Sequence, residues 1–260
     1  MAETILDRIA ASTRTRVARD KQSCAPVAMR RAALEAGPPT YSFAGALARP
    51  GLSFICEVKK ASPSKGVIAA DFPYLEIARD YAAAGADALS VLTEPEFFLG
   101  DPGYLREIAA EVGVPVLRKD FVVDPYQIDE ARVLGAAAVL LIVALLGPDL
   151  PQYVARAHDV GLTALVEVHS AAELDLALSA GALVIGVNHR DLRTFDVDLG
   201  LTERLRPAIP PDHLVVAESG VQTAADVRRL KDAGVNALLI GETLMRSNNK
   251  RDLLQEWAAA

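Results

Sequence analysis

The stretch YLEIARDYAAAGADALSVLT, residues 74–93, holds a complete structural unit of a helix, a stop and a strand. Its first part carries apolar residues at helical spacing and ends at Gly85, and its second part, DALSVLT, is a short apolar run. Glycine just past a helix adopts the left-handed conformation at little steric cost, which gives the helix a physical reason to end at Gly85. The stretch therefore predicts a helix that leads directly into a strand.

The same unit recurs along the chain from about residue 54. Glycines predicted to end helices are Gly85, Gly113, Gly135, Gly161, Gly181 and Gly234. The strand candidates are residues 54–61, 87–93, 114–120, 136–145, 163–169, 182–190, 214–220 and 235–241, and the last helix candidate is 250–260. Strict alternation of strands and helices indicates a parallel sheet. Eight such units favour a closed (β/α)8 TIM barrel over an open doubly wound sheet, which would more naturally carry a GxGxxG turn after its first strand.

Residues 1 to about 50 lie outside this repeat and are predicted to form a helical N-terminal extension of a single barrel domain covering residues 1–260. Helical apolar spacing marks residues 4–21 and 27–36. The basic residues of the first helix are Arg14, Arg16, Arg19 and Lys21. Charged residues on a helix usually face solvent, so a solvated face is the first interpretation, and a clamp for an anionic substrate is the alternative.

Composition limits the classes of partner. With 51% hydrophobic residues the chain can bury a large core, and Lys+Arg 27 against Asp+Glu 34 gives a formal charge of -7. This balance argues against non-specific binding of nucleic acid or an anionic membrane. Cys24 and Cys56 lack metal-ligand spacing, and Cys56 lies in an apolar run like a buried hydrophobe, so neither a metal site nor a disulfide is indicated. Without a signal-like or membrane-spanning apolar run, we expect a soluble cytoplasmic protein.

Charged residues gather where the strand candidates end, and in this fold the site is built from the carboxyl ends of the strands. Because side chains alternate along a strand, the inward set is predicted to be Glu57, Lys59, Lys119, Glu167, Arg190 and Glu218, with Asn188 on the same face as Arg190. Lys60, Arg118, Asp120 and His189 are predicted to face outward and pair with helices or water, and His169 to serve a helix start or the surface. Buried charge is costly unless paired, so the inward set indicates acid–base chemistry, with a structural layer of salt bridges as the alternative.

Two glycine-bearing turns follow the last two strand candidates: AESGV, residues 217–221, and LIGETLM, residues 239–245. The loops after strands seven and eight commonly hold phosphate in this fold, and backbone N–H groups at a helix start suit an anion. Gly220 and Gly241 would let a phosphate approach closely. The alternative is that both are ordinary glycines at helix entries.

A set of motifs along the chain resembles the indole-3-glycerol phosphate synthase family. The motifs are EVKKASPSKG, VLTEPEFFLGD, VLRKDFVVDPYQI, AVLLIVALL, LVEVHS, IGVNHRDLRTF, VAESGV and NALLIGETLMR, in that order from residue 57 to residue 246. The resemblance implies conversion of the sugar phosphate 1-(2-carboxyphenylamino)-1-deoxyribulose 5-phosphate into indole-3-glycerol phosphate, CO₂ and water. It implies no cofactor and no metal, and we expect a small anionic substrate as the partner of a monomer.

The resemblance also implies residue roles. By this resemblance, Lys119 looks like the general acid that protonates the substrate carbonyl. Glu167 looks like the general base, and Lys59 looks like a second acid. Glu57 would orient the lysines, and Glu218 and Asn188 would hold substrate hydroxyls or the amine. Ser62 and Arg190 would bind the anthranilate carboxylate end, and Phe98, Phe121, Leu140 and Leu192 would wall the aromatic ring. Ser219, Gly220, Leu239, Gly241 and Glu242 would hold the phosphate, with Glu242 binding only through its backbone N–H and its side chain turned away.

Two other functions are compatible with a barrel of this class. A phosphosugar isomerase would commonly use a Cys and an Asp at strand ends, and the strand ends offer neither in that arrangement. A barrel that binds a phosphorylated ligand without turnover would tolerate loss of Lys119. The SPSKG loop, residues 62–66, is predicted to become ordered when substrate binds.

Overall fold

The computed structural model describes residues 4–247 and 249–260, and its centre is a closed parallel barrel. The strands are β1(Ser53–Val58), β4(Ala88–Leu92), β5(Val116–Lys119), β6(Ala138–Ile142), β7(Thr163–Val168), β8(Val184–Asn188), β9(Leu214–Glu218) and β10(Ala237–Ile240). Each pairs in parallel with its neighbours, and β1 closes the ring by pairing with both β4 and β10. The predicted (β/α)8 architecture is confirmed.

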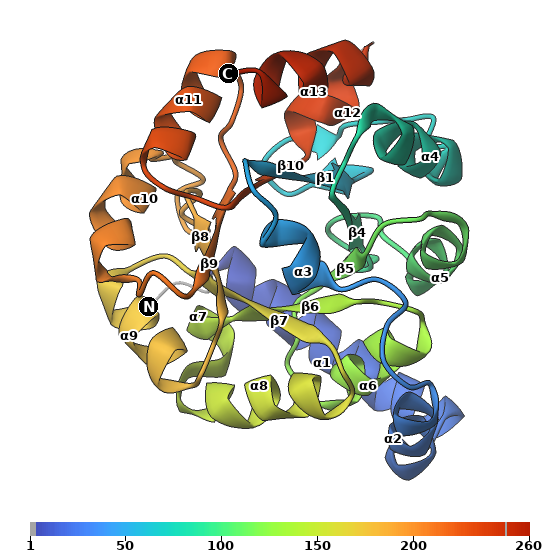
Figure 1. Ribbon diagram of the computed structural model, residues 1–260. Coiled ribbons are helices and arrows are strands. Elements are labelled where there is room, and N and C mark those ends of the chain that lie inside the picture. The colour runs from blue at the N-terminus through green and yellow to red at the C-terminus, as the bar shows by residue number, and fades with distance from the viewer. Residues whose placement is uncertain (1–3, 248) are drawn as a thin grey trace.

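Helices surround the barrel, as Figure 1 shows. They are α4(Tyr74–Ala84), α5(Pro102–Glu111), α6(Tyr126–Val133), α8(Leu150–Asp159), α9(Ala171–Ser179), α10(Gly200–Leu205), α11(Ala224–Asp232) and α13(Lys250–Ala258). Shorter helices are α7(Val143–Leu146), α12(Glu242–Arg246), η1(Gly147–Asp149) and η2(Arg206–Ala208). In the described residues, none of these helices combines the length and apolarity that crossing a bilayer requires.

Five of the six predicted glycine stops have the left-handed conformation: Gly85, Gly135, Gly161, Gly181 and Gly234. The prediction is wrong for Gly113, because α5 ends at Glu111, Val112 after it is extended, and Gly113 has no positive φ. The predicted strand 136–145 is also too long. The chain leaves the sheet after Ile142 and turns into α7, whose apolar residues suit a buried helix as well as a strand.

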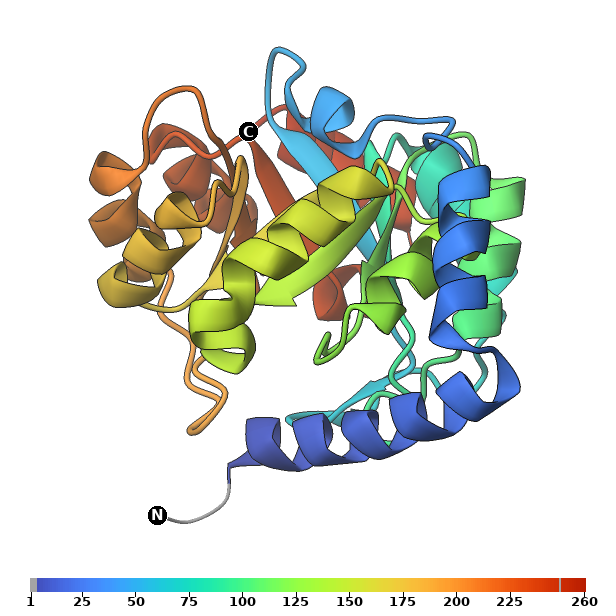
Figure 2. The ribbon, with the colours of Figure 1, turned by 90° about the horizontal axis from the view of Figure 1, so that it is seen from below.

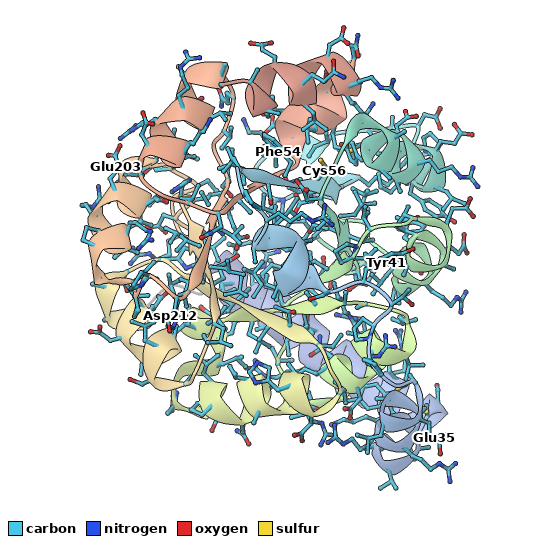
Figure 3. The ribbon with its side chains drawn as sticks, viewed as in Figure 1. Glu35, Tyr41, Phe54, Cys56, Glu203 and Asp212 are labelled. Atoms are coloured by element: carbon cyan, nitrogen blue, oxygen red, sulfur yellow. The ribbon has the colours of Figure 1, made fainter. Side chains whose placement is uncertain are left out.

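The core has two layers that follow the alternation of side chains along the strands. Ile55, Leu117, Leu140, Leu165 and Leu239 are members of the cluster inside the barrel. Cys56, Leu89, Val139, Val166 and Ile185 belong to the cluster between the barrel and the helices. In Figure 3, Cys56 lies within the fold, and the exposed Glu35 and Glu203 lie at its outer surface. Burial raises the pKa of the Cys56 thiol, as expected for a small buried hydrophobe.

The N-terminal extension consists of α1(Ile5–Ser23), α2(Pro26–Glu35) and α3(Phe43–Leu47). Figure 2 shows α1 lying across one end of the barrel with α2 turned away from it along the side, where α2 packs against α6. The short helix α3 was not predicted from the sequence. It lies at the opposite end, where the Ser53 hydroxyl at the start of β1 donates to the carbonyl of Ala46.

The prediction of a solvated basic face on α1 holds for Arg14 and Arg19, which are exposed, but is wrong for Arg16. Arg16 is buried, and its guanidinium donates to both carboxylate oxygens of Asp120 at 2.8 and 3.0 Å. Lys21 pairs with Asp124 at 2.5 Å. These contacts fix α1 to the chain just after β5, so its first turns lie over the mouth of the barrel.

Candidate active site

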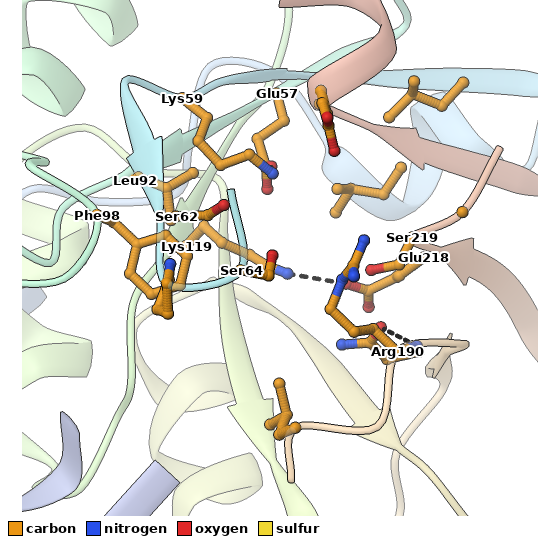
Figure 4. A pocket seen from close by; sticks show the side chains of 18 of the residues that line it. Glu57, Lys59, Ser62, Ser64, Leu92, Phe98, Lys119, Arg190, Glu218 and Ser219 are labelled. Atoms are coloured by element: carbon orange, nitrogen blue, oxygen red, sulfur yellow. Dashed lines mark hydrogen bonds and ion pairs between the residues drawn. The ribbon is translucent and has the colours of Figure 1, made fainter. Parts of the chain in front are cut away.

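A cavity of about 600 Å³ opens at the carboxyl ends of the strands. Residues at or just beyond the ends of all eight strands line it, and Ile5, Leu6 and Ile9 of α1 close it from one side. Every residue that the sequence assigned to the site contributes to its wall. Figure 4 labels several of them, among them Glu57, Lys59, Lys119 and Glu218. Lys60 and His189, which were predicted to face outward, do not line it, whereas Asp120 does.

The charged residues form two linked groups within the cavity. Glu57 and Lys59, two residues apart at the end of β1, make an ion pair. Lys119 of β5 reaches Glu218 of β9 at 2.9 Å and Glu167 of β7 at 3.6 Å. All three carboxylates are nearly inaccessible to solvent. The cluster therefore holds three acids and only two lysines away from bulk water.

This imbalance shifts the protonation equilibria. Burial alone would lower the pKa of Lys119, but Glu218, Glu167 and Glu57 outweigh it and raise that pKa, so the ammonium form is strongly favoured. Burial would raise the pKa of Glu57, yet the charges of Lys59 and Lys119 hold it below its usual value. For Glu218, burial dominates over the attraction of Lys119, and with repulsion from Glu167 it raises the pKa to about 7.

Glycines make room for this cluster, and the sequence interpretation missed one of them. A Cβ on Gly186 of β8 would overlap the Oε1 atom of Glu218. That oxygen is buried and has no hydrogen-bond partner within the described part of the chain. A Cβ on Gly241 would likewise overlap the Glu57 carboxylate and lie 2.8 Å from the Lys59 Nζ atom. A glycine inside a strand was the signal that could have pointed to Gly186.

Of the set predicted to face outward, Arg118 and His189 pair behind the strand ends as predicted, whereas Asp120 pairs with Arg118 and also lines the cavity. Arg118 is fully buried and donates to Asp120, to the Gln127 carbonyl and to the hydroxyl of Thr93, and it also pairs with Glu130 of α6. His189 donates through Nδ1 to the carbonyl of Ser219, and its Nε2 atom lies 2.7 Å from the hydroxyl of Thr202 on α10. These polar contacts fix the strand ends from behind.

At one side of the cavity lie the residues assigned to the carboxylate end of the substrate. The SPSKG loop forms a small antiparallel hairpin, β2(Ala61–Ser62) and β3(Gly66–Val67), in which Ser62 is buried. This hairpin was not predicted. Across the cavity, the Arg190 guanidinium donates to the carbonyl of Phe195 at 3.0 Å, and its backbone N–H donates to the side chain of Asn188.

The apolar wall is built around two aromatic rings. Phe98 and Phe121 lie with ring centroids 5.6 Å apart, and Leu140 and Leu192 continue the lining. Phe98 is held by Glu94, a buried residue that the sequence interpretation missed. The Glu94 carboxylate accepts from the backbone N–H groups of Glu96, Phe97 and Phe98 at 3.0, 2.7 and 3.0 Å. An acid just before a tight turn was its sequence signal.

The two glycine-bearing turns lie next to each other at the ends of β9 and β10. Ser219 and Gly220 have φ values of 69° and 86°, and a Cβ on Gly220 would overlap Val197. Consecutive left-handed residues turn their N–H groups toward a common point, which suits an anion. The Glu242 side chain is engaged by Arg246 at 3.2 Å and by Lys65 of the hairpin loop at 3.6 Å. Arg246 lines the cavity and was not assigned from the sequence.

His169, directly after β7, has the predicted helix-start role. Its backbone N–H donates to the carboxylate of Glu173 in the first turn of α9 at 2.7 Å. Its ring also approaches Glu167, with 3.5 Å between Nε2 and Oε1. The sequence did not anticipate this second contact.

Comparison with known proteins identifies the family to which this geometry belongs. A family model described as indole-3-glycerol phosphate synthase matches residues 6–257. The chain is also 52% identical over 254 residues to the indole-3-glycerol phosphate synthase of Endomicrobium trichonymphae, which covers 97% of this chain and 98% of that protein. The chain belongs to the indole-3-glycerol phosphate synthase family. It is thus a decarboxylating lyase of tryptophan biosynthesis, and the isomerase alternative is not supported.

Other relatives agree with this assignment. The indole-3-glycerol phosphate synthase of Ruminiclostridium cellulolyticum is 50% identical over 247 residues, with 94% of this chain and 95% of that protein covered. Among solved structures, a 3-hexulose-6-phosphate synthase superimposes with a TM-score of 0.63 at 16% identity, covering 80% of this chain and 99% of the other. At that identity the likeness supports the barrel fold of this synthase-family member and nothing further.

Proposed function

We propose that the cavity converts 1-(2-carboxyphenylamino)-1-deoxyribulose 5-phosphate into indole-3-glycerol phosphate, CO₂ and water with no cofactor. The observation that carries this proposal is the buried cluster of Glu57, Lys59, Lys119, Glu167 and Glu218 at the mouth of the barrel. Ring closure onto a carbonyl needs a proton donor, and dehydration needs a donor and an acceptor. The cluster contains both kinds of group within one cavity.

Lys119 serves as the general acid of ring closure. The three surrounding carboxylates keep it in its ammonium form, so it can donate to the substrate carbonyl oxygen as the aromatic ring carbon attacks. Its ion pairs with Glu218 and Glu167 aim the ammonium across the cavity. Such preorganised charge stabilises an oxygen that becomes negative only as the reaction proceeds.

The apolar wall favours the decarboxylation. Phe98, Phe121, Leu140 and Leu192 enclose the ring, while Ser62 and Arg190 contact the carboxylate. The Arg190 guanidinium already donates to the carbonyl of Phe195, so it does not offer all its donors to the substrate. A carboxylate that is loosely held in apolar surroundings is more easily lost as neutral CO₂.

Dehydration uses Lys59 as the acid and Glu167 as the base. Glu57 pairs with Lys59 and orients it, and Asn188 and Glu218 bind the substrate hydroxyls or amine. Removal of the hydroxyl as water needs one proton, and aromatisation of the new ring releases one. The separation of Lys59 and Glu167 on β1 and β7 supports their placement on different sides of the substrate.

The phosphate lies against the turns after β9 and β10, held by Ser219, Gly220, Leu239, Gly241 and Glu242. Backbone N–H groups supply the donors there, since a carboxylate beside a phosphate would repel it. The pairing of the Glu242 side chain with Arg246 and Lys65 supports this role for its N–H alone, because the two cations offset its charge.

Residues 1–260 act as a single barrel domain with its N-terminal extension. A cytoplasmic monomer that binds this anionic sugar phosphate, and neither nucleic acid nor membrane, fits the acidic composition, and these points stay predictions. The function itself is tested by incubating the purified chain with the carboxyphenylamino sugar phosphate and following indole absorbance and released CO₂. One CO₂ per indole is expected, and folded protein that forms no indole would refute the proposal.

A further inference from the structure

The proposed reaction consumes one proton in every turnover, and this inference rests on that proposed function. The substrate carboxylate carries a negative charge and leaves as neutral CO₂, while its bonding electron pair restores the aromatic ring. The carbonyl oxygen takes two protons to leave as water, and the base removes one proton as the indole forms. The sum is one proton taken up from solvent.

The acid–base cluster contains an internal source for only one of the two donated protons. The proton that Glu167 removes in dehydration balances the one that Lys59 donates, and these groups can exchange within the cluster. The proton that Lys119 donates at ring closure must come from outside. Glu167 is 2% exposed, and Lys119, whose side chain is 15% exposed, lines the cavity that the substrate would fill, so a route from solvent that bypasses the substrate is needed.

A chain of side chains leads outward from Lys119 through the end of β7. Lys119 Nζ lies 3.6 Å from Glu167 Oε2, and the other oxygen, Oε1, lies 3.5 Å from Nε2 of His169. On the far side of the ring, Nδ1 lies 3.4 Å from Oε2 of Glu173. The side chain of Glu173 is 23% exposed, whereas that of Glu167 is 2% exposed. The chain thus connects the buried cluster to the surface.

The backbone of His169 is held beside Glu173, so the ring stays within reach of Glu167 and Glu173. Glu173 accepts the backbone N–H of His169 at 2.7 Å, and its own backbone N–H donates to the Ser170 hydroxyl at the start of α9. The Nε2 atom is buried and makes no hydrogen bond within residues 4–247 and 249–260. The Nε2 atom can therefore donate or accept a proton, and the charged group beside it is Glu167.

The surroundings favour a protonated ring. Glu167 on β7, Glu173 on α9 and Glu218 on β9 are the charged groups that act on His169, and all three are acids. The neighbouring helix α7, which packs against both β7 and α9, has the sequence VALL and carries no titratable side chain. Burial lowers the pKa of His169, but the three carboxylates outweigh it and raise that pKa above its usual value.

We propose that His169 is a positioning residue for Glu167 and passes a solvent proton through it to Lys119 after ring closure. The Nε2–H bond breaks as Oε1 of Glu167 accepts the proton, and rotation of the carboxyl group then brings that O–H to the neutral amine of Lys119, which takes the proton. The ring is then neutral and keeps its Nδ1–H; a half-turn of the ring places the bare nitrogen next to Glu173, which passes it a proton taken from water. No electrons are transferred, and each group returns to its starting state.

The test compares His169→Ala and His169→Asn with the wild type in the indole assay between pH 6 and pH 9. We expect kcat to fall about tenfold or more with little change in KM, less than the roughly hundredfold or more that a group acting directly on the substrate contributes. The wild-type kcat should decline as pH rises through the pKa of His169, and this limb should be absent from both variants. Added imidazole should restore part of the kcat of His169→Ala.

Glu173→Gln is the second variant, because its amide oxygen can still accept the His169 backbone N–H but cannot carry the proton. It should lower kcat in the same pH range while circular dichroism stays that of the folded wild type. His213→Asn is the matched control, since His213 pairs with Asp212 away from the cavity, and it should leave kcat unchanged.

The relay is overturned if both His169 variants keep kcat within twofold of the wild type. It is also overturned if kcat falls but the pH limb persists and imidazole restores nothing, because the histidine would then be structural. Wild-type protein that forms no indole would instead refute the proposed function, so the two failures are distinguishable.

Discussion

Lys119 and Glu218 meet across the mouth of the barrel, with 2.9 Å between the ammonium and the carboxylate. They come from β5 and β9, which lie on opposite sides of the ring in the strand order β1-β10-β9-β8-β7-β6-β5-β4. A pair that spans the barrel keeps two buried charges compensated when the cavity is empty. Substrate that enters between them must take over part of that compensation, which links binding to the acid–base chemistry.

The raised pKa of Glu218 predicts a pH-dependent cost to stability. A carboxyl whose pKa rises from 4.5 in the unfolded chain to about 7 when folded binds a proton more tightly in the native state. Its contribution to the free energy of unfolding is therefore greatest below pH 4.5, is lost as pH rises toward 7, and is level above that. Glu218→Gln should remove this dependence, so the free energy of unfolding of the variant should rise relative to that of the wild type between pH 4.5 and pH 8. Urea unfolding at several pH values measures it, and parallel curves for the two proteins would contradict the assignment.

The space beside Glu218 predicts that Gly186→Ala damages the site more than the fold. A methyl group at Gly186 would overlap the Glu218 carboxylate and force it away from Lys119. We expect kcat to fall about tenfold or more, with an overpacking cost of about 1–3 kcal/mol in unfolding free energy. Gly113→Ala is the matched control, because its nearest neighbour, the Tyr41 hydroxyl, is 3.7 Å from the added Cβ and its φ is not positive. Equal activity of the two variants would show that Glu218 can move without consequence.

The turn organised by Glu94 predicts a loss of substrate binding. Glu94→Ala removes the acceptor for three backbone N–H groups and frees Phe98 from its position against Phe121. The apolar wall contacts substrate before and during the reaction, so KM should rise about tenfold while kcat changes less. Glu96→Ala, an exposed acid in the same turn, serves as control and should leave KM unchanged. A drop in kcat at constant KM would assign Glu94 a different role.

The two adjacent lysines of EVKK predict opposite outcomes. Lys59 lines the cavity and pairs with Glu57, whereas the half-buried Lys60 does not line it. Lys59→Met should lower kcat by about a hundredfold, the scale of one general acid, and Lys60→Met should stay within about twofold of the wild type. Both variants replace a lysine with methionine at neighbouring positions. Steady-state kinetics on the two therefore distinguish a loss of acid catalysis from an effect of removing one positive charge. Loss of activity in Lys60→Met alone would reverse the inferred orientation of β1.

The barrel could be predicted from the sequence because helix spacing, glycine stops and apolar runs repeat with one period. The alternation of side chains also separated Lys59 from Lys60 and Lys119 from Arg118 correctly. The pattern of apolar residues predicted a wrong strand boundary where the same residues suit both a strand and a helix. The apolar run 136–145 continues past the sheet into α7, because Val143 to Leu146 pack equally well as a helix turn.

The remaining errors concern partners that lie far away in the sequence. Arg16 is buried because Asp120, which is 104 positions later, faces it across the end of β5, and no spacing within α1 could reveal that partner. The same reason applies to Gly186, whose missing side chain matters only because Glu218 fills the space. The contact between His169 and Glu167 joins two residues near in sequence, at the end of the same strand. It could still not be predicted, because it depends on how the His169 ring is oriented next to Glu173.

The central claim is that Lys119 donates the proton that starts the reaction, and its most direct test is the turnover of Lys119→Met. Met keeps a long apolar side chain and removes only the ammonium, and folding is checked by circular dichroism. We expect a loss of about a thousandfold or more in indole formation, toward the upper range of proton-transfer catalysis. A folded Lys119→Met protein that forms indole within tenfold of the wild-type rate would contradict it.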